Sequence, residues 1–216
     1  MKLKELLSEI TKAKRGVKPA YTKYHVLKCL LLIYNDEPIG RIKLSKALNL
    51  GETSVRTLLS RLKELDIINI DRVGGVYLSD HGRSLLKKVM DIIHGIQKID
   101  SIYIEKIMPQ YKYVYSLSLK IPLRKLNIKL TSLRDIIIRS GADAALILIV
   151  ENGKLCLPYD DTVICEDSNE DLMFLRQGLN IDEAKTILLA LSSRSDNQAE
   201  KALIGTLIEL MENDLI

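Results

Sequence analysis

The chain has 216 residues, 47% of them hydrophobic and 28% charged, with a formal net charge of +4. This composition is typical of a globular protein, and the length suits two small domains. No apolar run approaches the roughly 18 uncharged residues that a membrane-spanning helix needs, so we expect no membrane partner. The first residues mix charged and apolar side chains, unlike a secretion signal, and predict a cytoplasmic protein.

Charge is distributed unevenly along the chain. Residues 1–100 contain 19 Lys and Arg against 11 Asp and Glu, whereas residues 101–216 contain 13 against 17. A basic surface attracts a polyanion and an acidic one is repelled by it. We therefore expect the two halves to have different electrostatic roles, with the N-terminal half meeting the polyanion.

The three cysteines are Cys29, Cys156 and Cys165. An odd number at these spacings matches neither a disulfide framework nor a zinc-ligand pattern. We expect all three to be reduced, with Cys29 acting as a small buried hydrophobe in a helix. Cys156 and Cys165 could sense an oxidant, but their neighbours are not basic enough to indicate a lowered thiol pKa.

Residues 1–20 begin with apolar side chains at helical spacing, Leu3, Leu6, Leu7 and Ile10, and continue into a basic stretch at residues 12–19. Basic tails serve either as solvated leaders or as arms that touch DNA. The sequence leaves both interpretations open.

Two helices are predicted next, over residues 21–34 and 41–48, because apolar residues recur there every three or four positions. In the second of these, Ile42, Leu44 and Leu48 mark the inward face. A third helix is predicted over residues 55–65 after a turn. In that turn Gly51 can supply unusual backbone angles, and Thr53 or Ser54 can cap the helix.

Residues 67–71 and 76–78 predict a two-stranded hairpin around Val73-Gly-Gly75. A fourth helix is predicted from Ser79. Its apolar positions form a seam with coiled-coil-like spacing, which would serve either self-association or packing within the chain. The seam consists of Leu85, Val89, Ile92, Ile96 and Ile99.

Pro109 is the predicted domain boundary, giving domains at residues 1–108 and 109–216. The second domain shows a β-α-β-β-α-β-α order, in which residues 185–191 could be a strand or a short helix. The order is typical of a split β-α-β sandwich, possibly ferredoxin-like. We therefore predict an α+β protein with an N-terminal winged helix-turn-helix and a C-terminal α/β sandwich.

Polar and basic side chains face outward on the third predicted helix. In a helix-turn-helix this helix enters the major groove, and the preceding helix bridges the DNA backbone. Arg56 could contact guanine, the hydroxyl residues could contact bases or phosphates, and the other basic residues are suited to phosphates. The predicted DNA contacts are Lys43, Lys46, Thr53, Ser54, Arg56, Thr57, Ser60, Arg61, Lys63 and Arg72.

Residues 41–78 resemble the winged helix-turn-helix of bacterial and archaeal transcription regulators. The resemblance rests on the recognition-helix pattern T-S-V-R-T-L-L-S-R-L and on the short wing, and it departs at Asp66, where that family usually has glycine. The whole layout, with S-G-A-D-A-A-L-I-L in the second domain, also resembles archaeal two-domain proteins whose C-terminal domain has no established activity. The resemblance implies a sequence-specific regulator that binds double-stranded DNA.

We expect a homodimer whose C-terminal domain assembles the protein or senses a small-molecule effector, by analogy with other regulators. Two alternatives stay open: a winged-helix adaptor that binds proteins, and an enzyme in the C-terminal domain regulated by the winged helix. RNA is a less suitable partner, because interleaved aromatics for base stacking are lacking.

The sequence shows no pattern that points to catalysis. His25, His81 and His94 are far apart, with no carboxylate or cysteine at ligand spacing. The acidic run at residues 166–171 lacks the ligand spacing of an EF-hand, and the glycines form no phosphate-binding motif. We expect no enzymatic activity, no metal site and no cofactor.

Overall fold

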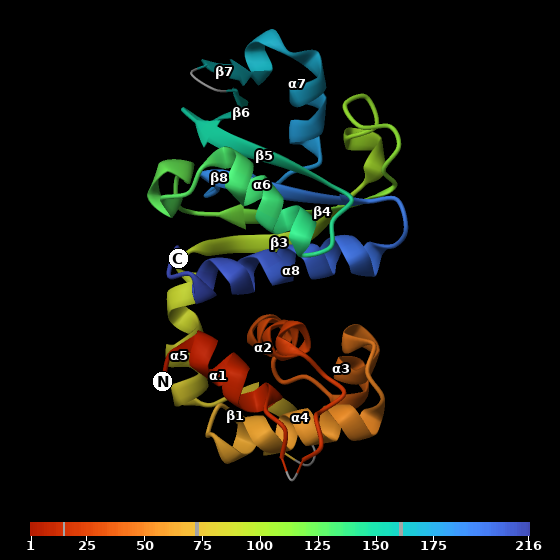
Figure 1. Cartoon of the computed structure of the whole chain (residues 1–216), viewed down its shortest axis with the longest axis vertical. Coiled ribbons are helices and arrows are strands. Elements are labelled where there is room, and N and C mark those ends of the chain that lie inside the picture. The colour runs from red at the N-terminus through yellow and green to blue at the C-terminus, as the bar shows by residue number, and fades with distance from the viewer. Residues whose placement is uncertain (15, 72–73, 160–161) are drawn as a thin grey trace. The chain divides into compact units, whose positions relative to one another are not determined.

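The computed structural model describes residues 1–14, 16–71, 74–159 and 162–216. The chain divides into two compact units, Met1–Lys88 and Val89–Ile216. The first is mainly helical and the second is built on a six-stranded sheet (Figure 1). The predicted α+β class is therefore confirmed. No described helix has the length and apolar character needed to cross a membrane.

The N-terminal unit is a group of helices followed by a hairpin. Its first helix is ordered, because Leu3, Leu6, Leu7 and Ile10 are all buried and the helix contacts α2 and α4. The interpretation of this segment as a solvated leader is therefore wrong for residues 3–11. The elements are α1 (Leu3–Thr11), α2 (Lys23–Asp36), α3 (Arg41–Leu48), α4 (Glu52–Glu64), β1 (Ile68–Asp71), β2 (Gly75–Leu78) and α5 (Asp80–Met90).

The turn between α3 and α4 depends on Asn49, which has φ 50° and ψ 44°. Asparagine is one of the few residues that enter this left-handed region readily. Gly51 has an ordinary φ of −62° and is the N-cap of α4, so the prediction that Gly51 supplies the unusual angles is wrong. Thr53 and Ser54 lie inside the first turn of α4, so neither caps the helix as predicted.

The exit from α4 passes through Asp66, whose φ is 54°. The N–H of Ile67 donates to the carbonyl of Leu62 at 2.9 Å, which closes the helix end. Glycine is the usual residue in this left-handed position, and Asp66 adopts the same conformation. The departure from the family pattern therefore leaves the geometry of the helix exit unchanged.

Strands β1 and β2 pair in antiparallel fashion and form the predicted hairpin. Ile39 joins its edge by exchanging two backbone hydrogen bonds of 2.9 Å with Val76. Gly75 has φ 101°, and a Cβ there would lie 2.9 Å from the carbonyl oxygen of Ile39. Only glycine fits where these backbones meet.

The long fourth helix of the sequence prediction is wrong beyond Met90. Residues Ile93–Ile99 form strand β3, which pairs with β4 (Tyr113–Leu119). The predicted seam therefore breaks, because Ile96 and Ile99 belong to a sheet. The chain divides at Lys88 and not at Pro109, since β3 is part of the second unit's sheet.

The second unit has one six-stranded sheet in the order β3-β4-β8-β5-β6-β7, with every neighbouring pair antiparallel. Three short 3-10 helices, η1 (Ser101–Tyr103), η2 (Leu123–Leu126) and η3 (Glu166–Ser168), lie in its connections. The remaining elements are α6 (Leu130–Arg139), β5 (Ala144–Glu151), β6 (Lys154–Tyr159), β7 (Thr162–Cys165), α7 (Glu170–Gln177), β8 (Thr186–Ser192) and α8 (Asp196–Glu212).

Strand β8, the segment that the sequence left undecided, is central in the sheet and every one of its residues is buried. It lies between β4 and β5, which α6 connects, so the predicted split β-α-β unit is present. In a ferredoxin-like sheet the last strand lies at an edge beside the first. The central position of β8 therefore gives a different strand order from the ferredoxin-like one.

Successive residues of β8 point to opposite faces of the sheet. Ile187, Leu189 and Leu191 share one core cluster with Leu172 and Leu175 of α7. Helix α8 packs on β4 and β8, and α6 packs on β5 and α8 (Figure 1). Helices therefore cover both faces, and the core is continuous through β8.

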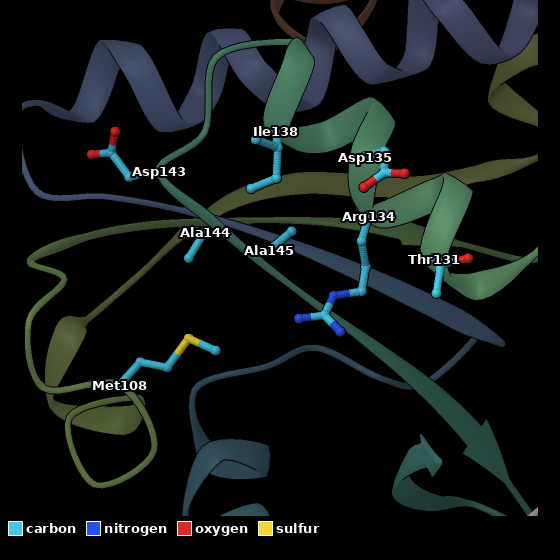
Figure 2. A pocket seen from close by; sticks show the side chains of 8 residues that line it. All are labelled: Met108, Thr131, Arg134, Asp135, Ile138, Asp143, Ala144 and Ala145. Atoms are coloured by element: carbon cyan, nitrogen blue, oxygen red, sulfur yellow. The ribbon is translucent and has the colours of Figure 1, made fainter. Parts of the chain in front are cut away.

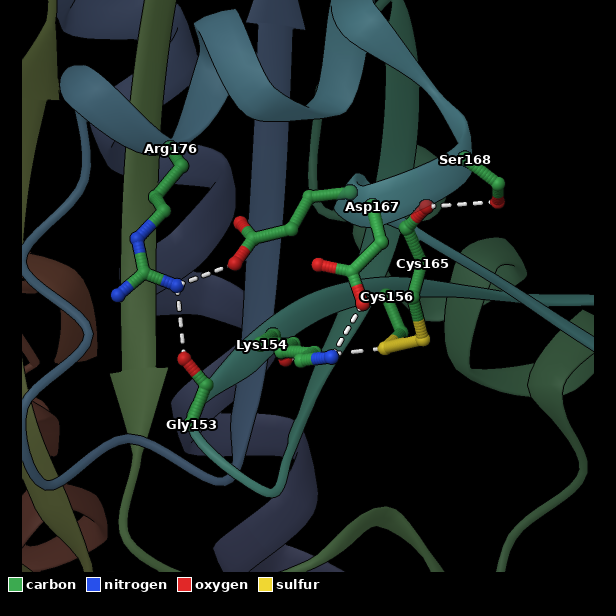
Figure 3. The surroundings of a disulfide bond; sticks show 8 residues. Gly153, Lys154, Cys156, Cys165, Asp167, Ser168 and Arg176 are labelled. Atoms are coloured by element: carbon green, nitrogen blue, oxygen red, sulfur yellow. Dashed lines mark hydrogen bonds and ion pairs between the residues drawn. A yellow bond between two sulfur atoms is a disulfide. The ribbon is translucent and has the colours of Figure 1, made fainter.

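Cys156 and Cys165 form a disulfide (Figure 3), so the prediction that they are reduced is wrong. They lie directly opposite each other in the β6–β7 pairing, with Cα atoms 4.0 Å apart. The sequence prediction contained no strand β7 and therefore no reason to pair them. Cys29 is fully buried as predicted, and desolvation raises the pKa of its thiol to about 12.

Candidate nucleic-acid interface

The outer face of α4 is a continuous polar stripe. Thr53, Arg56, Thr57, Ser60 and Lys63 are all exposed and recur every three or four residues, so they lie along one side of the helix. Ser54 is only half-buried at the edge of this stripe. The opposite side carries the leucines that fill the core. The prediction that these polar residues face outward is confirmed.

The charged groups of the stripe are available. Within the described part of the chain, neither Arg56 nor Lys63 makes an ion pair or a side-chain hydrogen bond. The hydroxyl groups are engaged locally, since Thr57 Oγ1 donates to the carbonyl of Thr53 at 3.0 Å and Ser60 Oγ donates to Glu64 Oε1 at 3.3 Å. Rotation about one bond frees such a hydroxyl for an external partner.

Helix α3 contributes two of the predicted lysines. Lys43 and Lys46 are both exposed, and Lys43 Nζ lies 2.8 Å from Asp36 Oδ2 in a solvent-exposed ion pair. Such pairs are weak and exchange readily for a phosphate. Ile42 is 60% exposed, so its predicted inward position is wrong. Leu44 and Leu48 alone fill the inward face of this described helix.

Arg61 does not belong to the interface, contrary to the prediction. Its side chain is buried, with 8% of its surface exposed. Its Nη1 donates to the carbonyl oxygens of Ile10 and Lys12, each at 2.7 Å. Its guanidinium also lies 5.9 Å from the centre of the Tyr21 ring. Arg61 therefore fastens the end of α1 to α4, and its donors are directed into the protein and away from solvent.

The structure brings a further basic segment to the C-terminal end of α4, outside the predicted DNA contacts. Lys14 Nζ lies 2.6 Å from Glu64 Oε2, and hydrogen bonding and charge from Lys14 lower the pKa of Glu64. These residues are 50 positions apart, so no local pattern could reveal the contact. Lys14, in the predicted basic stretch, therefore lies beside the C-terminal end of α4.

The N-terminal unit is basic as a whole, and the C-terminal unit is acidic. Residues 1–88 carry 18 Lys and Arg against nine Asp and Glu, and residues 89–216 carry 14 against 19. The basic surplus predicted for the N-terminal half is therefore a property of the N-terminal unit itself. Arg72, one of the predicted DNA contacts, lies outside the described residues.

The tertiary structure places one histidine beside a carboxylate. His94 Nδ1 lies 3.8 Å from Glu183 Oε2, whose other neighbour is Lys120 Nζ at 2.8 Å. A hydrogen bond and charge from Lys120 lower the pKa of Glu183, and His94 contributes less. No group of three or more His, Cys, Asp or Glu residues in the described part of the chain is arranged to hold a metal ion.

Comparisons with known proteins agree with the division into two units. Residues 25–84 match the family described as PH0730-like, N-terminal domain, and residues 112–210 match the domain of unknown function DUF4443. Among solved structures, the hypothetical protein PH0730 from Pyrococcus horikoshii OT3 is similar, with a TM-score of 0.64 and 25% identity. The alignment covers 91% of this chain and 96% of that one. Among curated proteins, none is significantly similar in sequence.

The chain therefore shares the two-domain architecture of the archaeal protein PH0730, which fits the predicted resemblance to archaeal two-domain proteins. The descriptions of the two families state no activity, and the similar solved protein is itself described as hypothetical. The function has to be argued from the exposed residues of α3 and α4.

Proposed function

We propose that this protein is a sequence-specific regulator that binds double-stranded DNA through α4. The outer stripe of α4, which lies wholly in the described part of the chain, carries the proposal. Its polar side chains flank the unpaired guanidinium of Arg56, and no large apolar side chain is exposed on it. Such a face is unsuited to a dry protein interface and suited to a groove lined by phosphates and base edges.

In this proposal α4 enters the major groove, which admits one helix. Arg56 lies in the second turn, where a recognition helix contacts base edges, and its planar guanidinium can donate two hydrogen bonds to guanine. Lys46 and Lys63 meet phosphates, which fix the register of the protein on the duplex without reading sequence. The N–H groups of the first turn of α4 have no side-chain cap, so they can also donate to a phosphate.

The test is a selection of bound duplexes from random DNA with the full chain at low salt. A recovered consensus is expected, and two-fold symmetry within it would indicate that two copies bind, as we also propose. The predicted coiled-coil seam no longer supports that dimer, because β3 replaces its second half. If no duplex is enriched above background, the DNA proposal fails.

Matched variants then test the residues. Arg56→Ala should weaken binding by about 1–3 kcal/mol, with most of the loss at one base pair. Lys46→Ala should instead lower the slope of log affinity against log salt by about one, with little change in sequence preference. Lys87→Ala removes one exposed charge from α5 and serves as the control. An equal effect of all three variants would contradict the assignment of roles.

A docking module for another protein is the second candidate, and Ile42 is the observation that favours it. This side chain is 60% exposed on α3, next to Lys43. An apolar anchor with a basic rim is typical of a protein interface. Ile42→Ser should leave DNA affinity unchanged if α4 reads DNA, and should abolish partner binding if α3 is a docking surface.

We also propose that the chain is not an enzyme. Support comes from Asp143, one of two carboxylates that line the C-terminal hollow described below, because hydrogen bonds from the protein itself saturate it. The other carboxylate, Asp135, is exposed to solvent. A catalytic acid or base needs a proton site directed at substrate.

A further inference from the structure

A hollow of about 330 Å³ opens in the C-terminal unit between α6 and the start of β5 (Figure 2). It lies on the segment Asp143-Ala-Ala, part of the sequence motif S-G-A-D-A-A-L-I-L that the nucleic-acid interface does not use. Its volume is within the range of small-ligand sites. Its lining residues are Met108, Thr131, Arg134, Asp135, Ile138, Asp143, Ala144 and Ala145.

The sequence explains why the sheet is open at this point. Strand β5 pairs with β8 from Ala144 to Ile149, whereas its pairing with β6 covers only Ile149–Glu151. Continuing that register would place Pro158 opposite Ile147. Proline has no N–H to donate, so the β5–β6 ladder stops. Among the described strands, the first part of β5 therefore has a neighbour on one side only.

Small side chains give the hollow its floor. Ala144 and Ala145 are consecutive residues of β5 and point to opposite faces of the strand, so the hollow passes over its open edge. Ala145 and Ile138 lie on the side of α6, and Ala144 lies on the side of Met108 (Figure 2). Ile138 is 42% exposed although it is a large aliphatic side chain on the sheet-packing helix. The site therefore offers an apolar surface that remains in contact with water.

One end of the hollow is held rigid by the Asp143 carboxylate. Its Oδ2 accepts hydrogen bonds from the backbone N–H of Ser193 at 2.9 Å, from Ser193 Oγ at 3.0 Å and from Ser192 Oγ at 3.3 Å, while Oδ1 accepts from Gln198 Nε2 at 3.1 Å. These donors, led by the Ser193 backbone N–H, lower the pKa of Asp143. Asp143 is thus a structural group whose charge is stabilised by these hydrogen bonds.

The other end holds an uncompensated positive charge. Arg134 projects from α6 over the hollow, beside Thr131, and its guanidinium points away from the Asp135 side chain (Figure 2). Within the described part of the chain, Arg134 makes no ion pair or side-chain hydrogen bond. By contrast Arg139, one turn further along α6, is paired with Glu209 at 2.6 Å. Arg134 also borders a smaller apolar hollow of about 210 Å³.

We propose that this hollow binds a small organic carboxylate, with the carboxylate at Arg134 and Thr131 and the apolar body on Ala144, Ala145, Ile138 and Met108. A guanidinium matches the two oxygens of a carboxylate in one plane. The apolar body of the ligand would remove the apolar side chains of the hollow from water, which favours binding. An inorganic anion has no such apolar body. The site does not depend on the proposed binding of DNA.

The experiment is a titration of the full chain with sodium benzoate, followed by NMR of alanine, isoleucine and methionine methyl groups. Saturable shifts are expected at Ala144, Ala145 and Met108, with a Kd of about 1 mM. Benzamide keeps the ring without the charge, and acetate keeps the charge without the ring. Each should bind at least about tenfold more weakly.

Two variants complete the test. Arg134→Gln should weaken benzoate binding about tenfold, because a charged hydrogen-bond donor is lost. Arg124→Gln makes the same change at an exposed arginine of η2 that does not line the hollow, and should have no effect. Ala144→Leu should fill the floor and abolish binding.

Any of three results would overturn the proposal. The first is the absence of saturable shifts at these methyl groups up to about 10 mM benzoate. The second is an Arg134→Gln variant with unchanged affinity and an otherwise native methyl spectrum. The third is competition by inorganic phosphate as strong as by benzoate, which would indicate an anion site without a role for the apolar floor.

Discussion

The substitution Arg61→Ala tests whether this residue belongs to the fold or to the DNA surface. In the structure its guanidinium donates to the carbonyls of Ile10 and Lys12, each at 2.7 Å, and is almost fully buried. A hydrogen bond to a charged group contributes roughly 1.5–3 kcal/mol. After the substitution, water can hydrate the carbonyl of the exposed Lys12 and replace part of what is lost. The free energy of unfolding is therefore expected to fall by about 3 kcal/mol.

Native-state hydrogen exchange of the amides in α4 measures this loss without assuming that both units unfold together. The free energy of exchange at Leu58 and Leu62 should fall by about 3 kcal/mol in the Arg61→Ala variant. Amides of α1 should lose their protection first, because that helix is no longer fastened to α4. Lys63→Ala, an exposed substitution two residues away, should change these values by less than about 0.5 kcal/mol.

Two results would refute the reasoning about Arg61. One is a loss below about 1 kcal/mol, since the two hydrogen bonds would then contribute little. The other is a stable variant with reduced DNA affinity, in which the slope of log affinity against log salt falls by about one. That result would indicate that Arg61 contacts a phosphate.

Two further predictions concern the packing of each unit. Gly82→Ala should destabilise the N-terminal unit by more than about 2 kcal/mol in the same exchange experiment, because a Cβ would lie 2.0 Å from the carbonyl oxygen of Ile67. Gly51→Ala, where a Cβ meets nothing within 4 Å, is the tolerated control, and equal effects would contradict the packing argument. Asp143→Asn should lower the melting temperature at pH 7, because hydrogen bonds led by the Ser193 backbone N–H depress the pKa of the native carboxyl. The stability that a lowered carboxyl pKa contributes is present above about pH 4, and it is lost as the pH falls through the pKa that Asp143 has in the folded protein. Thermal unfolding from pH 7 to about pH 2 should therefore show the two proteins converging in acid, and a constant difference would show that ionisation is not the cause.

Local patterns were sufficient to predict the outer face of α4. The positions of Thr53, Arg56, Thr57, Ser60 and Lys63 follow from the helical period, because a helix that buries its leucines must expose the residues between them. Arg61 breaks this rule. It lies on the inner side of the same helix, and only α1 and the residue after it supply the carbonyls that satisfy its charge.

The sheet shows why local patterns were insufficient elsewhere. Residues 91–99 have apolar spacing compatible with a helix, and the pairing of β3 with β4 decides that they form a strand. The disulfide likewise depends on the register of β6 with β7, which brings Cys156 opposite Cys165. Strand pairing joins residues on different elements, and neither the propensity nor the periodicity of one segment reports which residues face each other.

The amino-acid sequence by itself determined the polar outer face of α4, the hairpin after it, the charge difference between the halves and the order of most elements in the second unit. These features depend on residues within a few positions of one another. Tertiary structure alone decided where the units divide, which arginine is buried, which cysteines pair and where the hollow under Arg134 opens. Each of these depends on contacts between separate elements, whose partners are selected by packing and hydrogen bonding of the folded chain.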